Sequence, residues 1–240
     1  MSKKETTETR TKIDDLNDSL TRAELKVQNN KKLILYVGIA AVVVVLLVLG
    51  YIYLIHKPSV NKANTAYGMA DNKELAFQMQ SMQLDSAGRV TEMAAVTKAY
   101  EDAARNGGDG GNNATLMAAV YNFKSGQYQK ALDLLKEYDR NDEIIGATSK
   151  ALEGDCYVNL DKFDEAIKSF QEAAKIAKGN STLEPYCILK EATVQRHKGN
   201  FTAEAELYKK ILDTYPEYSQ MTGENYEAYY QRALAQAGQK

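Results

Sequence analysis

Three stretches of similar pattern recur in the second half of the chain. They are GQYQKALDLL (126–135), DKFDEAIKSF (161–170) and GNFTAEAELY (199–208). Their aromatic residues Tyr128, Phe163 and Phe201 are 35 and 38 residues apart, and a run with helical spacing of apolar residues precedes each stretch. A period of this length indicates repeated two-helix units, which must stack on one another to bury their apolar faces.

The repeated pattern resembles the tetratricopeptide repeat, whose period is about 34 residues. In that family, small residues at positions eight and twenty let two antiparallel helices approach closely, and large residues at seventeen and twenty-four fill the gap to the next unit. The matching residues are Gly154, Tyr157, Phe163, Ala166, Phe170 and Ala173 in unit 147–180, Ala119, Tyr128, Ala131 and Leu135 in unit 112–145, and Ala192, Phe201, Tyr208 and Pro216 in unit 185–218. The resemblance implies an α-solenoid with three degenerate repeats over 112–218.

The third unit departs from the family pattern at position twenty. There Glu204 replaces the small residue, with Ala203 and Ala205 beside it, which leaves the phase of this helix open. Position four, which is usually large and aromatic in the family, also departs in all three units. The residues at position four are Thr115, Lys150 and Ile188.

The composition of the chain favours helix over sheet. It has 3 Pro, 15 Gly, no Trp and 16 Tyr in 240 residues, so helix packing should rely on Tyr and Ala. Apolar residues at helical spacing predict two helices, roughly 59–82 and 89–105, that form a membrane-proximal hairpin within 56–111. The segment RNGGDGGNNAT (105–115) predicts a flexible loop, and 219–240 predicts one capping helix. The expected fold class is all-α.

A long apolar run precedes this region. Leu33 to Ile55 is 23 residues without a charge, and about 20 helical residues suffice to cross a bilayer. Tyr36, Tyr51 and Tyr53 lie near its ends, where aromatic rings prefer the headgroup level. A cleaved signal peptide, the alternative, would have a shorter core closer to the N-terminus, followed by small residues. The sequence therefore predicts a single uncleaved transmembrane helix over 33–55.

The flanking charges predict the orientation of this helix. Four basic residues, Arg22, Lys26, Lys31 and Lys32, precede the run, whereas Lys57 and Lys62 follow it. Basic residues favour the cytoplasmic side, so the tail 1–32 should be cytoplasmic and the larger domain should lie across the membrane.

The tail itself has a short apolar pattern. Its apolar residues recur in steps of three and four, which predicts either a short coiled-coil seam or a lone amphipathic helix. These residues are Ile13, Leu16, Leu20, Ala23 and Val27. The first ten residues, MSKKETTETR, are expected to be disordered.

The sequence contains no recognisable catalytic or metal-binding motif. A P-loop, GxSxG, HExxH and Cys-x-x-Cys are absent, and the two histidines, His56 and His197, have no associated carboxylate cluster. Cys156 and Cys187 are either two small buried side chains or one disulfide. The net charge of −2 does not suit nucleic-acid binding. We therefore expect no enzyme activity, no cofactor, no metal and no small-molecule substrate.

The candidate binding surface follows from the resemblance to the repeat family. In that family, positions two, five, nine, twelve and thirteen of each first helix line a concave groove. The corresponding residues are Asn113, Leu116, Val120, Phe123 and Lys124; Thr148, Ala151, Asp155, Val158 and Asn159; and Tyr186, Leu189, Thr193, Arg196 and His197.

The residues at position five exclude one known use of such a groove. A clamp for a C-terminal carboxylate would need Lys there, but the residues are Leu116, Ala151 and Leu189. The groove should instead suit an extended or helical protein segment with apolar side chains. The alternative is that the protein's own C-terminal helix covers part of it.

The layout as a whole resembles the ancillary Sec-translocon subunit family, in its Bacteroidetes-type form. The resemblance lies in NNKK before a single anchor and in the stretches SAGRVTEMAAVTKAYEDA and LEPYCILKEATVQRHKGNFTAEAELYKKILDTYP. It implies a bacterial inner-membrane protein whose periplasmic domain is a scaffold for the translocon, chaperones or secretory clients. The alternative function is an assembly or regulatory subunit of another envelope complex that acts by self-association.

Overall fold

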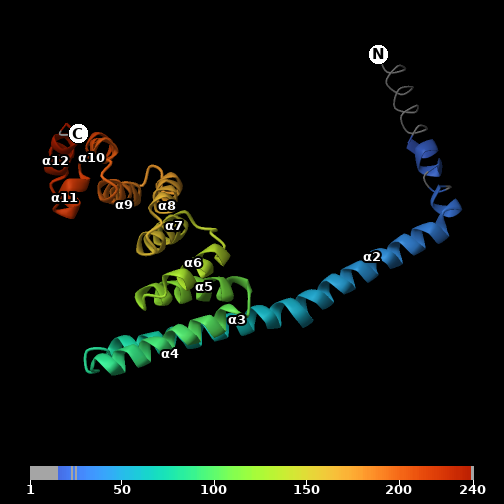
Figure 1. Cartoon of the computed structure of the whole chain (residues 1–240). Coiled ribbons are helices and arrows are strands. Elements are labelled where there is room, and N and C mark those ends of the chain that lie inside the picture. Colours follow the sequence, from blue (N-terminus) through green and yellow to red (C-terminus); the bar gives the residue numbers. More distant parts are fainter. Residues whose placement is uncertain (1–15, 23, 25, 239–240) are drawn as a thin grey trace, which may run out of the picture. The chain divides into compact units, whose positions relative to one another are not determined.

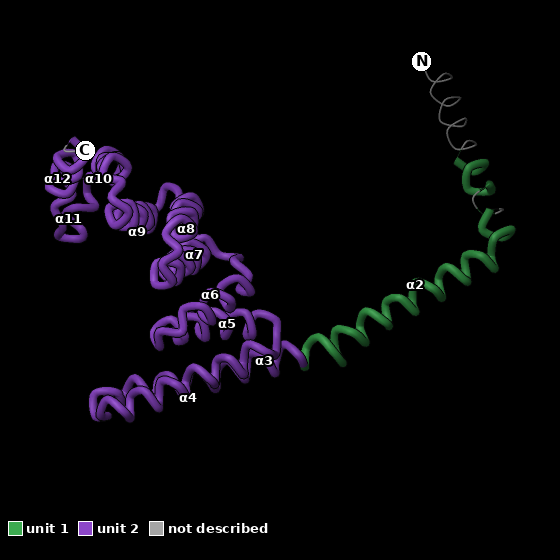
Figure 2. Tube along the Cα trace, in the orientation of Figure 1, with its two compact units in different colours: residues 1–58 green, residues 59–240 purple. Residues whose placement is uncertain are grey.

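The computed structural model describes residues 16–22, 24 and 26–238, and every regular element among them is a helix (Figure 1). The chain divides into two compact units, residues 1–58 and 59–240 (Figure 2). The expected all-α fold class is thus confirmed for the described residues.

The first unit contains one long apolar helix. Helix α2 spans Lys31–Tyr51 and is followed by a π-helical turn, η1, at Ile52–His56. None of the residues of α2 is buried, and Leu47, for example, is 68% exposed. Among the described residues, one helical stretch, beginning at Lys31, is long and apolar enough to cross a membrane. A helix that is apolar on all sides needs an apolar environment that its own unit does not supply.

The tail before α2 is helical where it is described. Residues 16–22, 24 and 26–29 are in helical conformation, and Leu16, Leu20 and Val27 are exposed. The other two residues of the expected apolar seam, Ile13 and Ala23, lie outside the described residues, as do the first ten residues. The choice between a coiled coil and a lone amphipathic helix therefore stays open.

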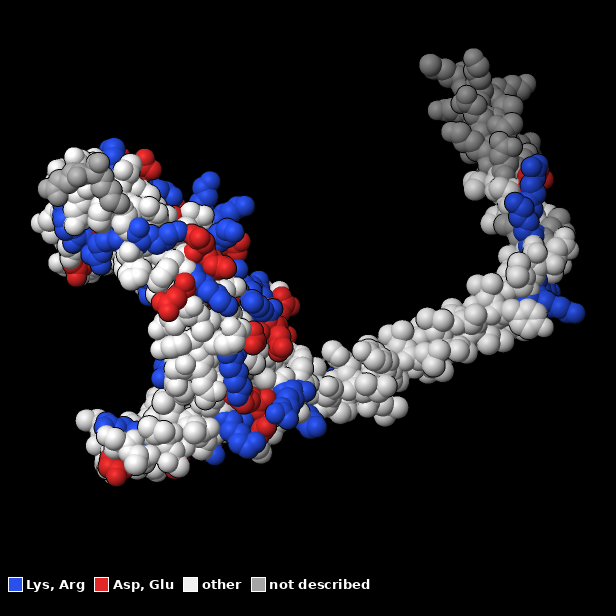
Figure 3. Space-filling view, viewed as in Figure 1, with Lys and Arg blue, Asp and Glu red and all other residues white. Residues whose placement is uncertain are grey.

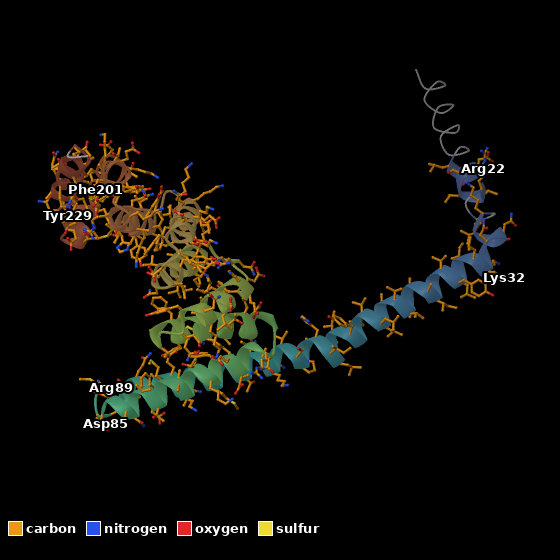
Figure 4. The ribbon with its side chains drawn as sticks, viewed as in Figure 1. Arg22, Lys32, Asp85, Arg89, Phe201 and Tyr229 are labelled. Carbon is orange, nitrogen blue, oxygen red and sulfur yellow. The ribbon has the colours of Figure 1, made fainter. Side chains whose placement is uncertain are left out.

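The second unit is a succession of antiparallel helices. They are α3 (Lys57–Gln80, which begins at the boundary), α4 (Ser86–Ala104), α5 (Gly108–Lys124), α6 (Tyr128–Glu137), α7 (Glu143–Asn159), α8 (Phe163–Ile176), α9 (Leu183–His197), α10 (Phe201–Thr214), α11 (Tyr218–Thr222) and α12 (Tyr226–Ala237). The pairs α5–α6, α7–α8 and α9–α10 correspond to the three repeat units of the sequence. Asp85 caps α4 at the turn after α3, where its carboxylate accepts a hydrogen bond from the Gly88 amide (Figure 4).

The helices pack mainly on their neighbours in sequence. Contacts are extensive between α4 and α5, α7 and α8, α8 and α9, and α9 and α10, and the first helices α5, α7 and α9 also touch in succession. This nearest-neighbour pattern is that of an α-solenoid, in which each hairpin buries the face of the next. The fold is therefore a tetratricopeptide-like α-solenoid.

The small residues of the repeat pattern lie where the helices of a pair approach most closely. A Cβ atom on Gly154 of α7 would lie only 2.5 Å from Cε1 of Phe170 in α8. Ala119, Ala131, Ala166 and Ala192 are fully buried. Because any larger side chain at these places would push the helices apart, the register of the repeats is set by these contacts.

The glycine-rich segment 105–115 is not the flexible loop that the sequence suggested. Helix α5 begins at Gly108, so it includes most of this segment, and it starts before residue 112, the expected start of the first repeat. A Cβ on Gly110 would lie 2.7 Å from the carbonyl carbon of Ala63 in α3. Asn112 also exchanges two hydrogen bonds with the backbone of Asp139. The glycines serve close helix packing, which offsets their low helix propensity.

The C-terminal region differs from the single helix expected over 219–240. It forms α11 and α12, separated at Gly223, whose φ of 73° ends α11 in the left-handed conformation. Helix α12 packs on α10. Its Arg232 Nη2 lies 2.9 Å from Oε1 of Glu204, which is fully buried. Glu204 can therefore replace the usual small residue, because Arg232 of the capping helix α12 pairs with its carboxylate. The neighbouring Ala205 is also buried.

Cys156 in α7 and Cys187 in α9 are both buried and free, so the disulfide alternative does not occur. Burial raises the pKa of the Cys156 thiol to about 12 and that of Cys187 to about 11, with neighbouring carboxylates adding to the effect. Both behave as small apolar side chains.

Buried tyrosines tie neighbouring helices together. The Tyr100 hydroxyl in α4 lies within hydrogen-bond distance of two carboxylates of α3, those of Asp71, at 2.7 Å, and Glu74, which share its one hydrogen. The Tyr215 hydroxyl after α10 donates to Glu184 of α9. Burial and these carboxylates raise the pKa of Tyr100 well above its usual range and that of Tyr215 to about 12.

We predict opposite effects of two glycine substitutions. Gly154→Ala should lower the free energy of unfolding by about 1–3 kcal/mol, because the new methyl group collides with the buried Phe170 ring. Gly68→Ala is the matched control, since a Cβ at this helical position has no neighbour within 4 Å. It should raise stability by up to about 1 kcal/mol through helix propensity. Urea unfolding followed by circular dichroism measures both, and equal effects would contradict the repeat register.

We also predict loss of stability in alkali. In the folded protein, Tyr100 and Tyr215 keep their protons above pH ~10, where tyrosine in the unfolded chain ionises. Their raised pKa values therefore contribute to the free energy of unfolding in full below about pH 10, and this contribution falls as the pH rises further. Each contributes a decline of about 1.4 kcal/mol per pH unit. Urea titrations at increasing pH should show this slope, and Tyr100→Phe should reduce it. Tyrosinate absorbance from most tyrosines before any loss of helix signal would contradict the prediction.

Candidate functional site

The first helices of the three repeats enclose a cavity of about 480 Å³, which we call the groove cavity. Its lining residues come from α5, α7, α9 with its preceding turn, and α11. They are Leu116, Met117, Val120, Thr148, Ser149, Ala151, Leu152, Asp155, Thr182, Leu183, Tyr186 and Tyr218. Cavities of this size, mainly apolar with a few polar groups, are typical of binding sites.

The helix stacking explains why these side chains converge. Each first helix turns its small residues, such as Ala119 and Gly154, towards the second helix of its own pair. Leu116 and Ala151 lie three residues earlier and are rotated by about 60° about the helix axis, so they lie at the edge of this face and line the concave side. Because the three first helices follow one another along the solenoid, their concave faces form one continuous surface.

Six of the fifteen residues expected in the groove line this cavity. They are Leu116, Val120, Thr148, Ala151, Asp155 and Tyr186. All six occupy positions two, five or nine of their repeats, which precede positions twelve and thirteen on each first helix. That they bind a ligand stays a prediction.

The other nine expected residues lie outside the groove cavity. They are Asn113, Phe123, Lys124, Val158, Asn159, Leu189, Thr193, Arg196 and His197. Several have other roles: Phe123 packs edge-on against Tyr128 with ring centroids 5.4 Å apart, and His197 packs against Phe163 at 4.6 Å. Phe123 and His197 therefore contact the first residues of the second helices α6 and α8.

The remaining lining residues were not expected from the sequence. Met117 and Leu152 share position six, so their common apolar character was a usable signal. Thr182 comes from the turn before α9, Leu183 is the first residue of α9, and Tyr218 comes from α11. Nothing local in the sequence points to the place of Tyr218. Helix α12, by contrast, packs on α10 and contributes no lining residue, so the C-terminal helix does not fill the cavity.

Asp155 is the charged residue of the lining, and it is paired. Lys190 Nζ of α9 lies 3.0 Å and 3.1 Å from the two carboxylate oxygens. Burial raises the pKa of Asp155, an effect that the Lys190 charge opposes. Burial alone would lower the pKa of Lys190, but the attraction of Asp155 outweighs it and holds that pKa above its usual value. The pair connects the first helices of the second and third repeats.

Charged side chains are unevenly distributed over the second unit. In the face shown in Figure 3, charged side chains of both signs lie over the helices near the C-terminus and along the edge of the repeats, and a broad uncharged surface lies over α5. A second cavity, of about 580 Å³, lies between α4 and the α5–α6 turn. Two of its lysines already have partners, because Lys130 pairs with Glu101 and Lys98 with Asp102. The groove cavity is thus the more apolar of the two.

The described residues contain no group of three or more His, Cys, Asp or Glu side chains placed to hold a metal ion. The chemistry that the groove cavity itself can supply is apolar contact, hydrogen bonding through a few oxygens and one carboxylate.

Comparison with known proteins found structural likeness only. Neither a family model nor a curated protein matches the chain. The crystal structure of MamA is similar over 65% of this chain and 96% of that chain, with 16% identity and a TM-score of 0.46. A signal transduction ATPase with a tetratricopeptide repeat sensor, from Pyrococcus horikoshii, is similar over 69% of this chain and 29% of that chain, with 19% identity and a TM-score of 0.30.

Proposed function

We propose that the chain is a membrane-anchored scaffold that binds an apolar segment of a partner polypeptide in the groove cavity. The observation that carries the proposal is the cavity itself, which spans three consecutive hairpins and is lined mainly by Leu, Met, Val, Ala and Tyr side chains. Grooves of this kind hold helical or extended segments through a few apolar anchor residues.

The properties of α2 support the anchor. Its side chains are exposed on all sides, and exposing so much apolar surface to water is unfavourable. In a bilayer the same surface is stable, and 23 uncharged residues are long enough to cross it. Lys32 lies at the start of α2, and Lys57 Nζ lies 4.2 Å from the Tyr53 ring centroid after it (Figure 4). The basic tail suits a cytoplasmic N-terminus, which places the repeats in the periplasm.

The resemblance of the sequence to ancillary Sec-translocon subunits suggests the partners. In that role the groove would hold part of the translocon, a periplasmic chaperone or a secretory client. Binding an apolar segment fits each of these, because polypeptides in transit expose apolar residues before they fold.

A second candidate function, assembly of an envelope complex by self-association, is favoured by a different surface. Leu75 and Met79 of α3 are spaced at i and i+4 and are 55% and 73% exposed, and Met82 in the turn after α3 is 94% exposed. Val90 of α4 is 63% exposed. Residues at this spacing share one helix face, and an apolar helix face without a partner is a common association surface.

Photocrosslinking in intact membranes tests the proposed function. A photoreactive residue at Leu116 or Tyr186, both in the cavity lining, should form adducts with one and the same partner polypeptide. Lys168 of α8, which is exposed and lies outside the lining, is the matched control position and should not form them. Adducts with translocon subunits or secretory clients support the first function. Adducts only with a second copy of the chain, or equal labelling from Lys168, would argue against it.

Protease protection tests the anchor and its orientation. With the inner membrane intact, a C-terminal tag should be digested from the periplasmic side, and an N-terminal tag should be protected. Replacing Lys31 and Lys32 with Glu removes the basic flank and should make the orientation mixed. Recovery of the full chain in the soluble fraction would rule out an anchor.

A further inference from the structure

The groove cavity has one charged side chain in an otherwise neutral lining. Asp155 projects from α7 between the apolar residues Ala151 and Leu152 of its own helix and Tyr186 of α9. Its side chain is 22% exposed. A ligand in the cavity must therefore lie next to this carboxylate, whatever apolar contacts it makes elsewhere.

The Asp155 carboxylate has unused hydrogen-bond acceptor sites. Two carboxylate oxygens offer about four acceptor sites, and Lys190 uses one on each oxygen. No other donor among the described residues makes a hydrogen bond to the carboxylate of Asp155, since Asn159 donates to its backbone carbonyl oxygen instead. A ligand that brings its own donor can thus bind the carboxylate without first breaking the pair with Lys190.

The neighbouring hydroxyl groups do not supply that donor. Thr148 Oγ1 donates to the Ile144 carbonyl oxygen at 3.0 Å, and Ser149 Oγ donates to the Gly146 carbonyl oxygen, also at 3.0 Å. Each hydroxyl has only one hydrogen to donate, so both can offer further lone pairs but no further hydrogen. This part of the lining is suited to accepting hydrogen bonds.

Lys190 shows how a cation fits beside the cavity. Its ammonium group contacts the carboxylate and lies 5.4 Å from the centroid of the Tyr186 ring, which also lines the cavity. Its side chain is 33% exposed on a flexible stem, so it can share Asp155 with a second cation or move away. A ligand ammonium or guanidinium group would add favourable charge interaction, whereas a ligand carboxylate would be repelled.

We infer that the groove cavity selects apolar polypeptide segments that carry a basic residue, and that Asp155 is the residue that determines this preference. The inference rests on the proposed function, because it specifies the partner of the same cavity. The apolar lining supplies most of the binding energy, and Asp155 adds discrimination between segments that are otherwise equally apolar.

The test compares three labelled peptides that differ at one position. All are leucine-rich and of equal length, with Lys, Met or Glu at the centre. Binding is measured by fluorescence anisotropy with the full chain in lipid nanodiscs, because detergent would compete for an apolar cavity. The Lys peptide should bind about 5-fold more tightly than the Met peptide, which corresponds to a partly exposed ion pair, and the Glu peptide should bind most weakly. Added salt should reduce the difference.

Two variants assign the preference to its residue. Asp155→Asn should remove the preference, so that the Lys and Met peptides bind this variant with affinities within about 2-fold of each other. Asp164→Asn is the matched control, because Asp164 is also paired with a lysine, Lys198, but lies outside the cavity lining. This control should keep the full preference for Lys.

A second substitution covers the possibility that Asp155→Asn does not fold. Lys190→Met removes the internal cation and leaves Asp155 charged, so it should increase the preference for the Lys peptide. Equal binding of all three peptides to the unmodified chain, or an unchanged preference in a folded Asp155→Asn, would overturn the inference and leave the proposed function standing. Loss of Met-peptide binding in a folded Asp155→Asn would mean that Asp155 only positions the helices.

The remaining outcomes concern the cavity as a whole. If no peptide binds, the proposed function fails together with the inference. If sedimentation shows self-association that Asp155→Asn weakens, the occupant of the cavity is a second copy, and the inference is again overturned.

Discussion

The close approach of the two helices of each pair, made at buried small residues such as Gly154 and Ala119, governs the structure of the repeat region. At Gly154 and Phe170 the helices are so close that even one added methyl group would meet the ring. This closeness directs the remaining apolar residues of each helix either towards the next hairpin or towards the concave side. The groove cavity is therefore a consequence of helix pairing, since the residues that line it are those left after the pairing contacts are made.

Polar contacts between successive hairpins complement this packing. Glu191 of α9 accepts a hydrogen bond from Gln171 of α8 at 2.7 Å, and Asp155 of α7 pairs with Lys190 of α9. At the C-terminal end, Glu204 is fully buried and depends on Arg232 of α12. A buried carboxylate without a partner is costly, so the third repeat is complete only when the capping helix is docked. The cap thus does more than shield the end of the solenoid from water.

The same physical reasoning connects the two proposals about function. A cavity that is mainly apolar favours apolar segments of many sequences, which suits a scaffold that meets varied partners. A single partly exposed carboxylate adds little affinity, but it distinguishes partners that are equally apolar. Such a combination lets one groove accept a class of segments while still preferring some members of that class.

The sequence by itself determined the helical hairpins, their order and the long apolar run. These features follow from the local sequence alone. The spacing of the aromatic and small residues predicts the hairpins, and the absence of charge over 33–55 predicts the apolar helix, without knowledge of contacts between distant residues. Six of the residues that line the cavity were expected from the resemblance to the repeat family. Only the tertiary structure decided that Gly108–Thr115 is helical, that Glu204 has a partner and that Tyr218 lines the cavity. Each of these depends on residues far away in the chain: Ala63 for Gly110, Arg232 for Glu204, and the first helices of the repeats for Tyr218. At the glycines of α5, helix propensity disfavours the observed helix, and at Glu204 and Tyr218 the local sequence does not predict the observed contacts. Tertiary packing determines the conformation and the contacts at these positions.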